Sequence, residues 1–384
     1  MDDQDVDEEW AREKAEDEAD RLRKAESAPV LSTDEFLTWR SPRQTGLNPT
    51  RMDNPLWQWL VRTRWSAYGA NNIYKGPSSF DAGPMWTFER FGMSETRLPS
   101  GRVIHIGGEH EDSYDPDFFI YNDAIIVCPD GEIAIYGYPV DEFQPTDFHT
   151  ATRLNESIVV IGGLGYPERR VAGTTPVYRL SIHTMSIERV ETRGESPGWI
   201  YKHTATLGAD GQTILVSGGE LWTGNDRPSV ENIDSWTLNT QTGEWARLTE
   251  RKWQRWTIRR LDQKPSRLWH LRQARWSRDH ADLGMDSGWI FAEAPDFDAL
   301  EMLYRLDEET PPPTAGKEFN VFTVVIDGLL VRFTEHRFWV EAIVEGQLIQ
   351  ARLDALQRKT LAMIERVEAA PCKLEKLPDG NFEM

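Results

Sequence analysis

The clearest hydrophobic pattern along the chain is a short apolar run that ends in two glycines and occurs three times. The runs span residues 104–108, 158–163 and 214–219. Their first glycines, Gly107, Gly162 and Gly218, stand 55 and then 56 residues apart. A near-constant spacing of this size indicates a repeated supersecondary unit.

Each repeat predicts four short strands separated by turn-forming residues. The first strands are expected at 93–98, 149–154 and 203–207, and the apolar runs follow them. Beyond a variable loop, third strands are expected at 123–127, 177–180 and 235–238. A last turn and strand then close each unit, at 130–136, 183–190 and 242–248.

The repeats resemble those of the kelch family. The resemblance is carried by the paired glycines, by His-Thr-Ala-Thr at 149–152 and 203–206, by Tyr121-Asn122-Asp123 and by Thr242-Gly243-Glu244-Trp245. In that family each repeat is one four-stranded blade of a β-propeller. The resemblance therefore implies a mainly β chain with a kelch-type β-propeller or partial propeller over residues 88–248. Glycine suits such a fold because it permits close backbone approaches near a crowded axis.

The number of visible repeats leaves the closure of the ring open. Propellers have about four to eight blades, whereas three repeats are recognisable here. Degenerate blades in the flanks or another subunit could complete the ring, or it could stay open, so self-association is one alternative. Trp86-Thr87-Phe88 is similar to the last strand of a blade, which favours the segment before residue 88 as the source of a missing strand.

The flanking segments differ in composition from the repeats. Residues 1–27 form a charged arm or helix, and residues 28–87 form an aromatic-rich segment packed on or completing the propeller, with a helix expected to start at Asn54 and Pro55. A basic, Trp-rich helical region with a proline linker occupies 249–314. Residues 315–384 predict a small α+β module, made of a three-stranded meander and a C-terminal helix at 347–368.

Composition narrows the class of protein. The formal net charge of −20 disfavours a nucleic-acid binder, because binding phosphates requires a broad basic surface. The two cysteines, Cys128 and Cys372, exclude a disulfide framework and favour a reducing compartment. The sequence has no long apolar run for a membrane span and no secretory signal, so we expect a soluble, cytoplasmic protein.

The acidic segment after the first paired glycines is the sharpest candidate site. Its candidate partner-binding residues are Glu109, His110, Glu111, Asp112, Tyr114, Asp115 and Asp117. Loops above a rigid scaffold often carry binding residues, and clustered carboxylates suit a Lys/Arg-rich partner. Oxygen ligands could also hold a cation, but the spacing is not that of an EF-hand, and we predict no metal. The alternative is a solvated acidic loop without a role in binding.

Other chemistry-bearing residues have structural explanations. Residues 251–278 contain ten Lys/Arg and interleaved tryptophans, a pattern that could hold single-stranded nucleic acid. We favour tryptophans in a core and arginines paired with acids of the propeller or the N-terminal arm. His149 and His203 stand at equivalent repeat positions, which favours a structural role, and His105 lies in an apolar strand.

These patterns together predict a non-catalytic, protein-binding kelch scaffold with a basic protein partner, no cofactor and no catalytic residue. A more specific hypothesis is an inhibitor or immunity-type protein that neutralises a toxin or enzyme. The alternative is an enzyme, namely a lyase, isomerase or hydrolase, that uses the end face of the propeller as a pocket for a sugar-like substrate. The fold alone does not decide between the two.

Overall fold

The computed structural model describes residues 12, 16, 18–43, 45–110, 116–224, 229–279, 296, 299, 302–316 and 320–377. The chain is mainly β, with several antiparallel sheets. It divides into two compact units, Met1–Thr249 and Glu250–Glu383, which are described separately below as the first and second unit. Within the described residues, no helix is both long enough and apolar enough to cross a bilayer.

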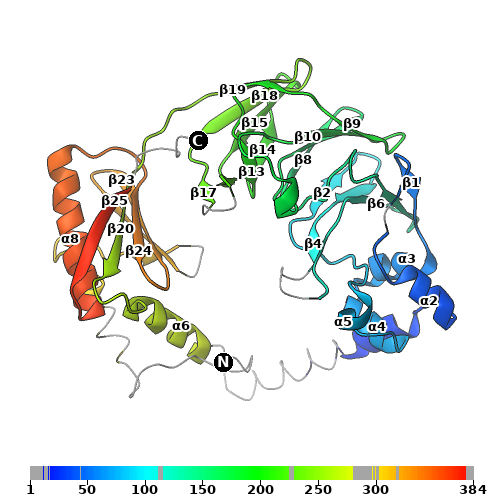
Figure 1. Cartoon of the computed structure of the whole chain (residues 1–384), viewed down its shortest axis with the longest axis horizontal. Helices are drawn as coiled ribbons and strands as arrows, with labels where there is room; N and C mark the ends of the chain where they lie inside the picture. Colours follow the sequence, from blue (N-terminus) through cyan, green and yellow to red (C-terminus); the bar gives the residue numbers. More distant parts are fainter. Residues whose placement is uncertain are drawn as a thin grey trace. The chain divides into compact units, whose positions relative to one another are not determined.

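The first unit contains the three repeats as three successive antiparallel sheets, which confirms the predicted strands (Figure 1). Sheet 1 consists of β2 (Ser94–Arg97), β3 (Val103–Ile106), β6 (Asp123–Val127) and β7 (Ile133–Gly137), sheet 2 of β8 (Thr150–Leu154), β9 (Ser157–Ile161), β10 (Val177–Ser181) and β11 (Ile187–Arg189), and sheet 3 of β14 (Thr204–Leu207), β15 (Thr213–Ser217), β18 (Ser235–Asn239) and β19 (Glu244–Arg247). The short strands β1 (Thr50–Arg51) and β12 (Arg193–Gly194) extend the outer edges of sheets 1 and 3. Each repeat therefore folds as the same up-and-down sheet.

Further short elements lie between these strands. They are β4 (Glu109–His110) paired with β5 (Phe119–Ile120), the sheet of β13 (Trp199–Tyr201), β16 (Glu220–Trp222) and β17 (Val230–Glu231), and the 3-10 helix η1 (Pro167–Arg169). All of them follow a pair of glycines or lead into the next sheet, so they form the loop end of the first unit.

The paired glycines are required because neighbouring repeats meet there. Gly107 has a φ of +61°, and a Cβ atom on it would lie 2.3 Å from the carbonyl oxygen of Thr146. Gly162 has a φ of +69°, and its Cβ would lie 2.2 Å from the carbonyl oxygen of Ile200. Any side chain would collide with the backbone that leads into the next sheet. The glycines are therefore part of the scaffold.

Two buried histidines join the sheets to one another. Strand β8 contacts both β2 and β14, so the first strands of the three sheets lie side by side (Figure 1). The Nε2 atom of His149 lies 2.8 Å from Oγ of Ser94 in sheet 1. The Nε2 atom of His203 lies 2.9 Å from Oγ1 of Thr150 in sheet 2. Each histidine thus bonds to the first residue of the preceding sheet, which agrees with the structural role expected from the sequence.

Helices cover the remaining apolar face of sheet 1. They are α2 (Thr33–Trp39), α3 (Pro55–Thr63), α4 (Ala67–Ile73) and α5 (Ser79–Ala82). As predicted, α3 starts at Asn54, whose side chain accepts a hydrogen bond from the backbone N–H of Trp57. Trp57 stacks on Trp86 with the ring centroids 4.7 Å apart, and both belong to a buried cluster that includes Ile125 and Ile135 of sheet 1. This helical cap gives the first sheet a covered outer face.

Trp86-Thr87-Phe88 does not form the blade strand that the sequence favoured, because no strand includes these residues. A buried ion pair holds this segment instead. Arg90 donates to both oxygens of Asp123, at 2.5 and 2.9 Å, and its guanidinium lies 3.3 Å from the ring centroid of Tyr121. Trp86 donates from Nε1 to the same carboxylate at 3.0 Å. Pairing and hydrogen bonds of this quality offset the desolvation of the two charges.

The second unit is built on one antiparallel sheet of strand order β21-β22-β23-β24-β20-β25. Its elements are β20 (Gln254–Arg260), α6 (Arg267–Asp279), β21 (Thr314–Ala315), β22 (Val321–Ile326), β23 (Leu329–Glu335), β24 (Val340–Val344), α8 (Gln350–Glu368) and β25 (Cys372–Leu377). The meander β22–β23–β24 and the helix α8 confirm the predicted α+β module. The boundary expected at 314/315 differs, because β20 pairs with β24 and β25 and so places the basic region in the same sheet.

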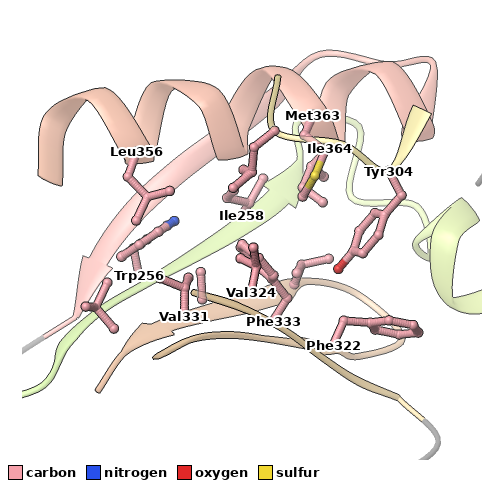
Figure 2. Close-up of a cluster of buried hydrophobic side chains, with 14 of the residues drawn as sticks. Trp256, Ile258, Tyr304, Phe322, Val324, Val331, Phe333, Leu356, Met363 and Ile364 are labelled. Carbon is pink, nitrogen blue, oxygen red and sulfur yellow. The ribbon is translucent and has the colours of Figure 1, made fainter. Parts of the chain in front are cut away.

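The core of the second unit lies between the sheet and α8 (Figure 2). Leu356, Met363 and Ile364 of α8 pack toward Trp256 and Phe333 of the sheet. Trp256 is fully buried, in agreement with the core role that the sequence favoured for it. The amphipathic helix thus covers one face of the sheet, and β20 contributes its tryptophan to that face.

The arginines of the basic region are paired within the second unit itself. Arg272 lies 3.5 Å from the buried carboxylate of Glu335, and Arg260 lies 3.1 Å from that of Glu368. The predicted pairing of this region with acids of the propeller or the N-terminal arm is therefore wrong for these two residues. The acids come from β23 and α8, which the sequence analysis assigned to a separate module.

Glu368 connects three elements of the second unit. Its buried carboxylate accepts hydrogen bonds from Ser266 Oγ at 2.6 Å and from the backbone N–H groups of Arg267 and Leu268 at 2.7 and 3.1 Å. Those N–H groups belong to the first turn of α6, where a helix favours negative charge. The same carboxylate pairs with Arg260 of β20.

We expect Glu368→Ala to destabilise the protein by roughly 2–4 kcal/mol, because it leaves the start of α6 and the buried Ser266 without their acceptor and leaves the half-buried Arg260 with Asp262 alone. Thermal unfolding measures this change. Glu375→Gln weakens two exposed ion pairs of the same sheet, with Lys373 and Arg259, and should cost at most about 1 kcal/mol. Equal effects of the two substitutions would contradict the role given to Glu368.

The buried histidines make stability depend on pH. Burial lowers the pKa of His149 to about 3 and those of His105 and His203 to about 4. The unfolded chain takes up protons below about pH 6.5 that the folded protein does not. Stability is therefore fully present above that pH and declines as the pH falls toward the folded pKa values, by about 1.4 kcal/mol per pH unit for each histidine.

We expect His149→Gln to reduce this pH dependence, and His183→Gln is the control at an exposed histidine. Unfolding midpoints measured between pH 7.5 and 4.5 test this. Identical slopes in the wild type and His149→Gln would show that His149 is not the neutral histidine described here.

Candidate functional site

Acidic residues follow the paired glycines in sheets 1 and 3 at equivalent positions. Glu109 comes directly after Gly108 and starts β4, and Glu220 comes directly after Gly219 and starts β16. The glycines turn the chain out of each sheet, so both carboxylates are placed at its loop end. The backbone of Glu109 is fixed by reciprocal hydrogen bonds with Phe91 at 2.8 Å.

Glu109 meets a second carboxyl group from the segment that leads into sheet 2. Asp147 is fully buried, and its Oδ1 accepts a hydrogen bond of 2.6 Å from the backbone N–H of Gly165. The Glu109 and Asp147 carboxyl groups lie close enough for the charge of Asp147 to act on Glu109. Two ionised carboxylates that are buried near each other repel, which favours the protonated form of one of them.

Burial and mutual repulsion raise the pKa of both carboxyl groups. Desolvation, and then the charge of Asp147, raise the pKa of Glu109 to about 7, and Lys202 acts in the opposite direction. Desolvation also raises the pKa of Asp147, although the N–H of Gly165 and the charge of Arg170 oppose it. Carboxyl groups that share a site generally behave in this way.

Glu220 lies in a second cluster of polar side chains. Tyr201 donates to Oε2 of Glu220 at 2.6 Å, and Nζ of Lys202 lies 3.1 Å from Oε1. Lys202 also lies 5.4 Å from the ring centroid of Phe148. The cationic group near the carboxyl pair is thus already engaged by Glu220 and an aromatic face.

An arginine and aromatic rings complete the surroundings. Arg170 donates from Nη2 to the carbonyl oxygen of Gly165 at 2.8 Å, and its guanidinium lies 5.8 Å from the ring centroid of Trp222. Trp222 meets Trp199 edge to face, with centroids 6.5 Å apart. Carboxyl groups, cations and aromatic faces therefore come together from the linkers of all three sheets.

The structure describes three residues of the predicted acidic site, namely Glu109, His110 and Asp117. Glu109 and His110 form β4, and Glu109 joins the carboxyl pair. Asp117 instead accepts a hydrogen bond from Ser79 of α5, so it lies against the helical cap. The remaining candidates lie outside the described residues, namely Glu111, Asp112, Tyr114 and Asp115.

The sequence interpretation did not include Asp147, Tyr201, Lys202 or Glu220. One available signal was the acid that directly follows the glycine pair in the first and third repeats. Asp147 and Tyr201 each stand two residues before an equivalent histidine, His149 or His203. Aligning the repeats could therefore have predicted that Asp147 and Tyr201 lie at the same end of the sheets. It could not have predicted that the carboxyl groups of Glu109 and Asp147 lie near each other.

Other parts of the described chain offer different surfaces. No group of three or more His, Cys, Asp or Glu side chains there is placed to hold a metal ion. A polar cleft of about 680 Å³ lies at the opposite end of sheets 2 and 3, lined by residues that include Arg179, Glu188 and Gln241. Arg179 pairs with Glu188 at 3.5 Å and donates to the carbonyl oxygen of Thr240 at 2.8 Å, so it bridges the two sheets.

Comparisons with known proteins give partial structural likenesses. No family model and no curated protein sequence matches the chain. The solved structure of YjhT matches 43% of this chain and 53% of its own, with 13% identity and a TM-score of 0.28. A fungal alcohol oxidase of the AA5 family, solved in complex with copper, matches 43% of this chain and 44% of its own, with 12% identity and a TM-score of 0.27. The alignments thus span about half the length of these structures.

We expect Glu109→Gln to change how stability depends on pH. The raised pKa of Glu109 means that the folded protein keeps a proton that the unfolded chain loses above about pH 4.5. The stability associated with this proton is fully present below that pH and is lost as the pH rises through 7. Glutamine stays neutral, so the melting temperature of Glu109→Gln relative to the wild type should increase from pH 5 to pH 8. A difference that is constant across this range would contradict the raised pKa of Glu109.

Proposed function

We propose that the three sheets are kelch-type blades and that their loop end binds a protein partner through a basic side chain directed at Glu109. The observation that carries this proposal is the placement of Glu109 beside the fully buried carboxyl group of Asp147 from the adjacent repeat, where burial and mutual repulsion raise the pKa of both groups. The net charge of −20 supports a basic partner, because complementary charge accelerates encounter and suppresses wrong partners.

The pair favours a cationic ligand for a specific physical reason. A lysine or arginine placed beside Glu109 would supply the positive charge that the pair lacks, and both carboxyl groups could then ionise. Lys202 is less able to do so, because it is shared with Glu220. Binding would therefore release a proton, and the affinity would increase as the pH rises toward and above 7. An inhibitor or immunity-type role is the specific form of this proposal.

Affinity purification from the native host, followed by mass spectrometry, tests the proposal. We expect the wild type to retain one basic protein in near-stoichiometric amount and Glu109→Lys to retain at least tenfold less of it. Glu244→Lys is the matched control, because it makes the same change of charge at an exposed position of β19. Equal loss in both variants would indicate non-specific attraction to an acidic protein, and unchanged retention in Glu109→Lys would refute the site.

Calorimetry with the recovered partner then tests the proton linkage. We expect the measured heat to vary with the ionisation enthalpy of the buffer in the direction of proton release. The variation should disappear in Glu109→Gln, which has no proton to release. A heat that is independent of the buffer in the wild type would show that the carboxyl pair does not change its protonation on binding.

A second candidate function is supported by the same pair. A carboxyl group with a raised pKa suits general acid–base catalysis near neutral pH, and the tryptophans around Arg170 could lie against a sugar ring. This favours a lyase, isomerase or hydrolase on a sugar-like substrate as the alternative. Thermal shifts with a panel of monosaccharides and sugar acids, present in the wild type and absent in Glu109→Gln, would favour the enzyme over the binding protein.

A further inference from the structure

The three sheets differ systematically in the face that each presents to the next one. Equivalent positions follow from the strand register, in which Ile106 pairs with Ala124 in sheet 1, Ile161 with Val177 in sheet 2, and Ser217 with Ser235 in sheet 3. The first two pairs are buried and apolar, whereas the third pair consists of two partly exposed serines. The same position in the repeat has therefore changed from apolar to hydroxyl-bearing.

The next row of the sheets shows the same change. Ile104 pairs with Ile126 in sheet 1, and both are buried against sheet 2. In sheet 2 the row holds Val159 and Arg179, and Val159 is buried against sheet 3. In sheet 3 it holds Leu215 and Thr237, and Leu215 is 40% exposed while Val159 is 1% exposed.

Two kinds of contact join sheet 1 to sheet 2 and sheet 2 to sheet 3. Among the described residues, neither kind recurs at the equivalent positions of sheet 3. Gly107 and Gly162 lie against the backbone that enters the next sheet, whereas no atom of the described residues lies within 4 Å of a Cβ built on Gly218. Ser94 and Thr150 each bond to a histidine of the next sheet. The equivalent Thr204 donates instead to the carbonyl oxygen of Ser217 within its own sheet, at 3.0 Å.

We infer that the repeat array of the first unit ends at sheet 3 and that the outer face of this sheet does not bind a second copy of the chain. Repeat arrays need such polar ends, because an exposed apolar sheet face would lead to association. At the other end, the helical cap buries the outer face of sheet 1. The first unit is thus a three-sheet array with a helical cap at one end and a polar sheet face at the other. This inference concerns the ends of the array and does not depend on the proposed partner site.

Leu215→Glu and Val159→Glu form a matched pair for testing it, because they place the same charge at equivalent positions of sheets 3 and 2. We expect Leu215→Glu to shift the melting temperature by no more than about 2 °C, as for other surface substitutions. Val159→Glu should lower it by at least about 10 °C or prevent folding, because it buries a charge. Val159→Thr and Leu215→Thr repeat the comparison with milder changes. A loss in Leu215→Glu as large as that in Val159→Glu would overturn the inference.

The mass in solution, measured by light scattering, provides an independent test. We expect the wild type and Leu215→Glu to have the same mass at every protein concentration. A wild-type dimer that Leu215→Glu dissociates would overturn the inference. The triple variant Ser217→Ile, Ser235→Val, Thr237→Ile restores the apolar face, and we expect it to associate as concentration rises. If it stays monomeric, the polarity of this face is not what ends the array.

Discussion

The close approach of one repeat to the next at the paired glycines is the constraint on which the first unit depends. The backbone oxygens of Thr146 and Ile200 occupy the space that a side chain at Gly107 or Gly162 would need. The linkers pass close to the ends of β3 and β9, where the glycine pairs begin. Neighbouring sheets can therefore pack their apolar faces together and form hydrogen bonds through His149 and His203. The same approach brings the residues on those linkers together at one end.

The candidate site follows directly from this arrangement. Glu109 leaves sheet 1 just after its glycine pair, and Asp147 enters sheet 2 one residue after Thr146, the residue that the first pair contacts. Their carboxyl groups therefore lie near each other at the junction of the two repeats. Burial makes full ionisation of both unfavourable. Two neighbouring carboxyl groups that do not readily ionise together are suited to binding a cation or exchanging a proton.

Each unit contains an ion pair that joins segments far apart in the sequence. In the first unit, Arg90 is enclosed by Asp123, Trp86 and Tyr121 and attaches the segment before the repeats to sheet 1. In the second unit, Glu368 attaches the start of α6 to β20. Both pairs connect segments far apart in sequence, and each has enough hydrogen bonds to offset desolvation. The arginines of residues 251–278 that looked available to a nucleic acid include members of such pairs.

The sequence by itself determined the local elements and their repetition. The strands of the three sheets, the start of α3 after its cap Asn54 and the helix α8 all follow from period, turn residues and capping, which act over a few residues. Tertiary structure decided what depends on distant partners. It placed β20 between β24 and β25, held Trp86 through an ion pair in place of a strand, and placed Asp117 against Ser79 of α5. It also brought Asp147 to Glu109, because the pairing of two acids 38 residues apart is fixed by how neighbouring sheets pack and by no pattern within either segment.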